Sequence, residues 1–232
     1  DAWAYYFGAS YQLSDADRLE FYAIGAPQRH GQNLYRQNIA AYDHEYAKSL
    51  DDYDEAALED YPESDRGRLY NENGSPVSSS YKGKQYFYMY GAKEKDRYDP
   101  DFLNERENYF HKPQVNLNWY HTFSDQFRLA TTAYFSGGSG GGTGTYGSVR
   151  WNYHIGEESP SRYVAWDATI ERNQGSDSGS YGILRNSVNQ QWTLGAISKA
   201  TYNVNDNLKV IGGVDWRTAE IDHFRQVRDL LG

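Results

Sequence analysis

Residues 111–142, HKPQVNLNWYHTFSDQFRLATTAYFSGGSGGG, contain two runs of alternating apolar and polar side chains on either side of a short polar turn. In the first run Val115, Leu117 and Trp119 share one parity, and the positions between them are polar. Successive side chains of a strand point to opposite faces, so this alternation predicts a strand with one apolar and one polar face. The alternation resumes after Ser124-Asp125-Gln126, which predicts a tight antiparallel hairpin.

The same pattern occurs three times along the chain. Hairpins are predicted at 2–25, 113–136 and 190–218, each with two arms of about ten residues, the length that a tilted strand needs to cross a bilayer. Each is joined by a short turn that contains Asp. The chain is therefore predicted to be all-β and antiparallel, with about six strands built as copies of one hairpin.

Charged side chains along these arms keep to the polar parity. The apolar rows contain many Trp and Tyr near the strand ends, as in the aromatic girdles of membrane barrels. This distribution favours an antiparallel transmembrane β-barrel segment over a soluble β-sandwich. The charged residues would then form a wall that faces the lumen: Arg18, Glu20, Arg128, Lys199, Lys209, Asp215 and Arg217.

The connections alternate between short and long. The turns within the hairpins are short, whereas the loops at 26–112 and 137–189 are long, which is the asymmetry of outer-membrane barrels with short periplasmic turns and long extracellular loops. A sheet in lipid must close on itself, and six strands are too few at this spacing, so we expect the chain to be part of a larger barrel. The sequence begins inside a strand pattern without a signal peptide, which indicates a mature form or an internal piece.

Aromatic residues in the long loops are the candidates for ligand capture. Tyr86, Tyr88 and Trp151 have flat rings that suit sugars, haem-like rings or peptides, and packing of the loops on one another is the alternative role. A helix is predicted over 163–174, before Gly175. The acidic stretch 43–65 is interpreted as a solvated loop with one short helix, because it lacks the spacing of a calcium loop.

Signals for catalysis are weak. The run GGSGGGTG formally matches two glycine motifs of enzymes, but no helical pattern follows it, and we interpret it as a flexible loop. The six histidines have no metal-ligand spacing and cysteine is absent, so no metal site, cofactor or enzymatic activity is predicted. The net charge of −9 argues against nucleic acid as a partner.

Several segments of the chain resemble consecutive barrel segments of TonB-dependent outer-membrane receptors of the Bacteroidetes-like branch. These segments are FGASYQLSDADRLEFYAIGAPQRHGQ, HKPQVNLNWYHTFSDQFRLATTAYFSGGSGGGTG, WDATIERNQ with LRNSVNQQW, and LKVIGGVDWRTAEIDHFRQVRDLLG. The resemblance covers nearly the whole chain except the acidic part of the first long loop, and the order and spacing of the hairpins match as well.

The resemblance implies a barrel of about 22 strands with an N-terminal plug. Such a receptor takes up a scarce nutrient across the bacterial outer membrane with energy supplied through the TonB complex. The plug, the TonB-contacting box and a terminal strand that ends in an aromatic residue are not in this sequence. The small-molecule, glycan or peptide ligand and a surface lipoprotein partner remain open. Alternatives are a passive porin or small structural barrel, and a soluble β-sandwich binding module.

Overall fold

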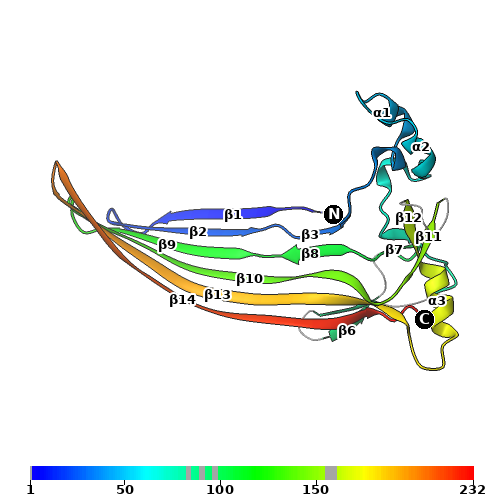
Figure 1. The fold of residues 1–232 in the computed structure, drawn as a ribbon. Helices are drawn as coiled ribbons and strands as arrows, with labels where there is room; N and C mark the ends of the chain where they lie inside the picture. Colours follow the sequence, from blue (N-terminus) through cyan, green and yellow to red (C-terminus); the bar gives the residue numbers. More distant parts are fainter. Residues whose placement is uncertain (1, 82–84, 89–91, 96–98, 155–160) are drawn as a thin grey trace. The chain divides into compact units, whose positions relative to one another are not determined.

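The computed structural model describes residues 2–81, 85–88, 92–95, 99–154 and 161–232 (Figure 1). It is 56% strand and 12% helix with antiparallel pairing, which confirms the predicted all-β class. The strands are β1 (Tyr5–Gln12), β2 (Asp17–Gly25), β3 (Gln28–Gly31), β4 (Gly74–Pro76), β5 (Gln85–Tyr88), β6 (Ala92–Lys95), β7 (Phe102–Asn104), β8 (Glu107–His111), β9 (Gln114–Thr122), β10 (Phe127–Gly147), β11 (Arg150–Tyr153), β12 (Arg162–Ala165), β13 (Gly182–Asn205) and β14 (Leu208–Asp229). The helices are η1 (Ile39–Ala41), α1 (His44–Lys48), α2 (Ala57–Asp60), η2 (Gly67–Leu69) and α3 (Trp166–Gln174).

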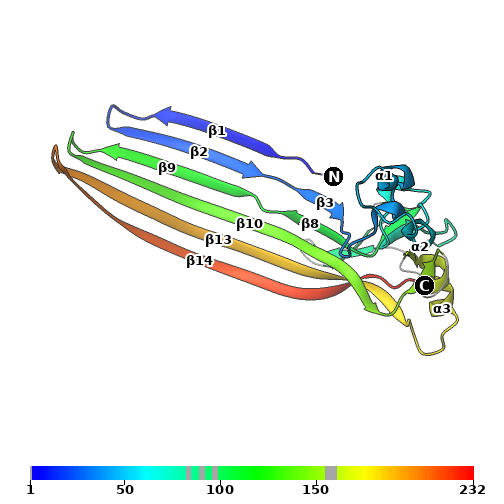
Figure 2. The same cartoon turned by 45° about the horizontal axis from the view of Figure 1, so that its top comes forward.

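The main sheet has eight strands, and six of them follow one another in the order β1-β2-β9-β10-β13-β14 (Figures 1 and 2). The short strand β3 pairs with β8, which in turn pairs with β10. The predicted hairpins are therefore present, and their three tight turns lie at the same end of the sheet, on the left in Figure 1. In the described part of the chain no pairing joins β1 to β14, so the sheet is open there.

The register between strands brings the predicted apolar residues onto one face. Opposite residues of antiparallel strands share a face, and Leu19 lies opposite both Tyr11 and Trp119, while Leu117 lies opposite Ala133. We call this the apolar face: it consists of the odd-numbered positions of β1, β2, β9 and β10. The even-numbered positions of β13 and β14 belong to it as well, because the Thr131 hydroxyl hydrogen-bonds to that of Ser198 and the Trp192 indole to Glu220. The other face is the polar face.

The first two hairpins repeat one turn in atomic detail. In the first, the backbone N–H groups of Leu13 and Ser14 donate to the Asp17 carbonyl oxygen, and in the second those of Phe123 and Ser124 donate to the Phe127 carbonyl oxygen. The side-chain oxygen of Ser14 or Ser124 accepts from the second and third N–H groups that follow it, at 3.1–3.3 Å. The Ser-Asp sequence of each turn thus supplies its own hydrogen-bond acceptor.

Three strands are much longer than predicted. β10 has 21 residues, β13 has 24 and β14 has 22. The glycine run predicted as a flexible loop is instead part of β10, because the neighbouring strand approaches too closely for a side chain: a Cβ on Gly140 would lie 2.7 Å from the Cβ of Phe110. Gly147, which ends the strand, has a φ of +85°, a conformation that other residues rarely adopt.

The chain divides into two compact units. Unit 1 consists of residues 1–29, 109–141 and 188–224, and unit 2 of residues 30–108, 142–187 and 225–232. The hydrophobic core lies in unit 2, where Trp166 is 1% exposed and its indole nitrogen donates to the Leu103 carbonyl oxygen at 2.7 Å. The other members of this core are Val77, Leu103, Val164, Ile170, Leu184 and Leu231. In the described part of unit 1, Val188 is the single buried hydrophobic residue.

The helices belong to unit 2. The predicted helix over 163–174 begins later, at Trp166, because residues 162–165 pair with β11 as β12, and it ends before Gly175 as predicted. Trp151, which lies within the long loop predicted at 137–189, is part of β11. The acidic stretch 43–65 contains two short helices, α1 and α2, rather than one. No described helix is long and apolar enough to cross a membrane.

Candidate functional site

Two of the predicted wall charges form a cluster on the polar face of unit 1. The Arg18 guanidinium lies 3.2 Å from the Glu20 carboxylate and 4.7 Å from the centre of the Tyr120 ring. The Tyr22 hydroxyl donates to the other Glu20 oxygen at 2.9 Å. The four side chains satisfy one another, which assigns Arg18 and Glu20 a structural contact within the wall.

The other five wall residues are exposed. Arg128 lies at the start of β10 opposite Thr122, and the rest lie on β13 and β14. No described acidic or basic residue forms an ion pair with any of them, namely Arg128, Lys199, Lys209, Asp215 and Arg217. They are therefore available to water, to a solute or to another chain.

The apolar face has charged exceptions near its ends. Asp17 is the first residue of β2, and its carboxylate accepts from the Trp119 indole nitrogen at 2.9 Å and contacts His121 at 2.6 Å. On β14, beyond the predicted end of the hairpin, Glu220 accepts from the Trp192 indole nitrogen at 2.9 Å. The prediction that the apolar face carries no charged residue therefore holds only for the part of the face between the Asp17–Trp119 and Glu220–Trp192 contacts. Each carboxylate is held by a Trp, as at a boundary between apolar and wet surroundings.

Among the predicted ligand-binding aromatics, Trp151 is the one whose side chain the structure describes. The side chains of Tyr86 and Tyr88 lie outside the described residues. Trp151 is partly buried against the core of unit 2, and the Arg162 guanidinium covers its ring at 4.2 Å from the ring centre. Arg162 also pairs with the buried Glu72 carboxylate at 3.3 Å. Trp151 thus makes loop-packing contacts, as in the alternative to ligand capture.

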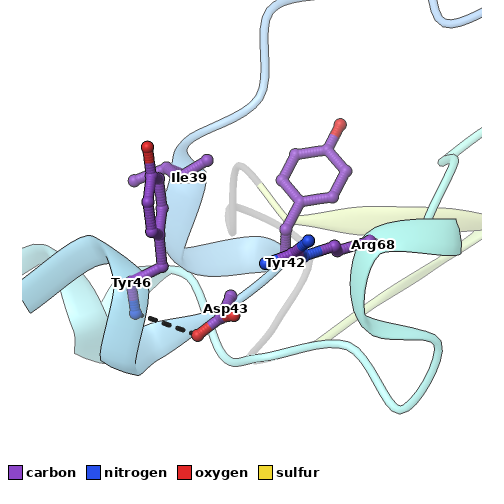
Figure 3. Close-up of a pocket in the computed structure, with 5 residues that line it drawn as sticks. All are labelled: Ile39, Tyr42, Asp43, Tyr46 and Arg68. Carbon is purple, nitrogen blue, oxygen red and sulfur yellow. Dashed lines mark hydrogen bonds between the residues drawn. The ribbon is translucent and has the colours of Figure 1, made fainter.

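A pocket of about 530 Å³ lies in unit 2, in a part of the chain where no site was predicted. We call it the Tyr pocket, and its lining residues are Ile39, Tyr42, Asp43, Tyr46 and Arg68. Figure 3 shows the Tyr42 and Tyr46 rings directed to the same side of the segment, with Arg68 reaching in from η2. The Tyr46 side chain is 50% exposed, so a ligand can reach its ring from solvent.

The Tyr pocket is formed by η1, α1 and η2, which their own polar side chains hold in place. The Asn38 side chain accepts from the Ala40 N–H at 3.0 Å and from the Tyr53 hydroxyl at 2.7 Å, and it caps η1. Asp43 caps α1 by accepting from the Tyr46 N–H at 2.9 Å (Figure 3). Both caps are sequence features that local propensity explains.

Contacts across the segment fix the second wall of the pocket. The His44 N–H donates to Glu63 at 3.0 Å, and the Ser64 N–H donates to the Ala41 carbonyl oxygen at 3.0 Å. The Tyr42 ring contacts the Tyr70 ring edge-on, and its hydroxyl accepts from Asn33. Burial raises the pKa of Tyr42, so the hydroxyl is neutral at physiological pH.

The charge of the chain is concentrated beside this pocket. Residues 43–65 contain ten acidic residues and one Lys, and the remaining 22 acidic and 22 basic residues of the chain balance. The segment therefore carries the whole net charge of −9. Arg66 and Arg68 follow directly and place two positive charges at its end. No three His, Asp or Glu side chains in the described ranges are grouped so that they could hold a metal ion.

The sequence contained one local signal for the Tyr pocket. Asp43 lies between Tyr42 and Tyr46, and as an N-cap residue it indicates that a helix starts between the two rings. Ile39 and Arg68 had no such signal, because the loop fold brings them together over 29 positions. Comparisons of the chain with family models, with curated proteins and with solved structures gave no match.

Proposed function

We propose that unit 1 is a segment of a transmembrane β-barrel in the bacterial outer membrane. The observation that carries this proposal is the exposure of the apolar face on strands that are not at the sheet edge. Leu117 on β9 is 47% exposed, Phe135 on β10 is 46% and Leu194 on β13 is 43%. Each of these strands has a neighbour on both sides, so the exposure results from the lack of a second layer among the described residues.

An apolar face of this extent needs a covering environment. Burial of apolar surface contributes about 25 cal/mol per Å², and a soluble sandwich obtains it by packing a second sheet on the apolar face. Lipid supplies the same environment without a second sheet. Near each end of the apolar face a Trp side chain donates to a carboxylate, Trp119 to Asp17 and Trp192 to Glu220. These contacts support the membrane proposal, because Trp is enriched at the interface between lipid and water.

The opposite face suits a wet lumen. It holds the Arg18 and Glu20 cluster and the five exposed charges described above. It also carries three exposed isoleucines, Ile24, Ile197 and Ile211, which would face the water of the lumen. A barrel wall of this composition accommodates a solute pathway or a plug.

We propose further that the barrel belongs to a TonB-dependent receptor that imports a scarce nutrient. The support for this finer statement is the resemblance of the hairpin sequences to that family. Its partners would be outer-membrane lipid and the TonB complex, contacted through a plug outside this sequence. A passive porin differs in one measurable way, because it admits small solutes to vesicles without an energy source.

Site-directed spin labelling tests the membrane assignment. The chain has no Cys, so single-Cys variants carry one label each. Leu117→Cys and Leu194→Cys report on the apolar face, and Ile197→Cys and Lys209→Cys on the polar face. The polypeptide that carries this sequence is reconstituted in phosphatidylcholine vesicles, and the collision rates of each label with oxygen and with a water-soluble nickel chelate are compared.

The proposal predicts high oxygen and low nickel accessibility at positions 117 and 194, and the reverse at 197 and 209. Equal nickel accessibility on both faces would contradict it. Low accessibility to both reagents at 117 and 194 would instead indicate that a second protein layer covers the apolar face, as in a soluble sandwich.

A further inference from the structure

We infer that three arginines of unit 2, Arg106, Arg185 and Arg225, bind a phosphate dianion over the bare backbone of Gly144. We call these three side chains the Arg cluster. Such a site does not depend on the membrane assignment of unit 1. Its basis is the convergence of guanidinium groups on one glycine, the excess of positive charge around them, and the open space next to it.

The Arg cluster comes from neighbouring strands of the main sheet. Arg106 directly precedes β8, Arg185 lies on β13 and Arg225 lies on β14. Gly144 lies on β10, which pairs with β8 and with β13, and β13 pairs in turn with β14 (Figure 2). Side chains from the two strands that flank β10 can therefore reach the same stretch of its backbone.

Two guanidinium groups converge on Gly144. A Cβ atom at position 144 would lie 2.9 Å from Arg106 Nη1 and 3.3 Å from Arg185 Nη2. Gly142 lies two residues earlier on the same side of β10, and a Cβ there would meet no atom closer than the Glu107 carbonyl oxygen at 3.9 Å. The two glycines thus leave a strip of bare backbone on which a small ion can approach both guanidinium groups.

The Arg cluster carries more positive than negative charge. Glu105 is the one described acidic residue that forms an ion pair with it, at 3.4 Å from Arg106 Nε. The same Glu105 oxygen already accepts from the Thr145 hydroxyl at 2.6 Å and from the Thr145 N–H at 3.3 Å. Three guanidinium groups and one carboxylate leave a net charge of +2, which a phosphate dianion neutralises.

Arg185 is the member of the cluster that the excess charge affects most clearly. Burial and the positive charges of Arg225 and Arg106 lower the pKa of Arg185, although Glu105 opposes the shift. Its Nη1 donates to the Ser187 hydroxyl at 2.6 Å, which leaves Nη2 at Gly144 for another acceptor. Because like charges held this close repel one another, an anion bound between them stabilises the folded state.

A phosphate dianion suits the Arg cluster better than a carboxylate does. Guanidinium groups are planar forks whose N–H groups match the oxygens of either anion. A carboxylate has two oxygens and one negative charge, whereas a phosphate group offers at least three strong acceptor oxygens and a second charge. Each of the three guanidinium groups can then donate to a different oxygen of the same ion.

Isothermal titration calorimetry with inorganic phosphate tests this site. The polypeptide that carries this sequence is kept in a phosphate-free detergent at pH 8, where phosphate is a dianion, and chloride holds the ionic strength constant. Phosphate is expected to bind and acetate is not. Arg185→Gln is expected to weaken phosphate binding by about tenfold or more, since hydrogen bonds between charged groups are the strongest ones in such a site.

Gly144→Ala is a second variant that leaves the charge unchanged. Its Cβ would displace the Arg106 and Arg185 guanidinium groups, so it is also expected to weaken phosphate binding. Arg150→Gln is the matched control, because Arg150 is exposed on β11 in the same unit and is not among the charges that act on Arg185. Hydrogen exchange of unit 2 verifies that each variant folds, and Gly144→Ala decides the test if Arg185→Gln does not.

Absence of phosphate binding would overturn the inference, as would an affinity that Arg185→Gln and Arg150→Gln change equally. Acetate that binds as tightly as phosphate would overturn it in favour of a carboxylate. Binding of glucose 1-phosphate without binding of inorganic phosphate would overturn it as well, since the sugar would then supply the contacts. The spin-labelling result does not affect these outcomes, because the labelled positions lie in unit 1.

Discussion

Unit 1 and unit 2 differ in the exposure of their apolar side chains. Unit 2 encloses Trp166, Leu184 and Leu231 in a core from which water is excluded, as a small soluble domain does. Unit 1 consists of strands as regular as any in a soluble sheet, yet Leu117 and Leu194 on its inner strands remain about half exposed. The difference shows that strand formation requires only alternation and pairing, whereas the stability of the apolar face in unit 1 requires material outside the described sheet.

The largest effect is expected from Trp166→Ala. The substitution removes a side chain that is 1% exposed and leaves the Leu103 carbonyl oxygen without its donor at 2.7 Å. Loss of a buried Trp costs about 3–5 kcal/mol, so amide protection in unit 2 should fall sharply while unit 1 is unchanged. Hydrogen exchange followed by mass spectrometry measures both units in one experiment.

Trp216→Ala is the control for this prediction. Trp216 lies on β14 in unit 1 and is 55% exposed, so its loss should leave protection in unit 2 as it was. If the two Trp variants lowered protection of unit 2 equally, the assignment of the core to unit 2 would be wrong.

A matched pair on β13 tests the two faces of unit 1. Leu194 on the apolar face and Ile197 on the polar face are aliphatic, three residues apart, and 43% and 45% exposed. In a membrane, Leu194→Arg should cost about 2–4 kcal/mol at the bilayer midplane and less near the interface, and Ile197→Arg should cost little. The measurement is the urea midpoint for refolding into vesicles.

In water the same pair should behave alike, because both side chains are already accessible. Equal urea midpoints for the two variants in vesicles would therefore contradict the assignment of the apolar face to lipid. Asn118 is unsuitable as the polar-face partner, since it is only 8% exposed and accepts a hydrogen bond from Thr132 at 2.7 Å.

The two units also differ in how much of their structure can be predicted from the sequence. The hairpins of unit 1 were predictable because alternation of period two and Ser-Asp turns are local patterns, and the register of Tyr11 with Leu19 within the first hairpin follows from them. The continuation of β10 through the glycine run was not predictable from the sequence. A run of glycines shows no alternation of apolar and polar side chains, and the need for glycine at position 140 depends on the close approach of Phe110.

In unit 2 the short elements depend on distant partners. β12 replaces the first turn of the predicted helix because it pairs with β11, and the Tyr pocket needs Ile39 beside Arg68. Trp151 lies on β11, and the cover of its ring by Arg162 could not be predicted from spacing. The local signals in unit 2 were the end of α3 before Gly175 and the caps of η1 and α1.

A smaller effect is expected from Ser124→Ala in the second turn of unit 1. Ser124 accepts from the Gln126 and Phe127 N–H groups at 3.3 and 3.1 Å in an exposed turn, so its loss should cost about 0.5–1.5 kcal/mol. Gln126→Ala, in the same turn, removes a side chain that the turn geometry does not use. Refolding rates of the two variants should differ, with Ser124→Ala slower. Identical rates would show that the turn forms without its side-chain acceptor.

The smallest effect is expected from the pH response of unit 2 through His154. The ring lies edge-on to Tyr70 and near Tyr163, and burial lowers the pKa of His154 below its ordinary value of 6.5, although Asp65 opposes the shift. Because the folded state then binds protons less readily than the unfolded state, the contribution of His154 to stability is complete above the unfolded pKa. It is lost as the pH falls through the folded pKa.

Amide exchange of β11 and β12 should therefore be faster at pH 5 than at pH 7.5, after correction for intrinsic rates, and His154→Phe should weaken this difference. Unit 1 peptides measured in the same samples provide the control, and a His154→Phe variant with an unchanged pH response would assign that response to carboxylates in unit 2 instead.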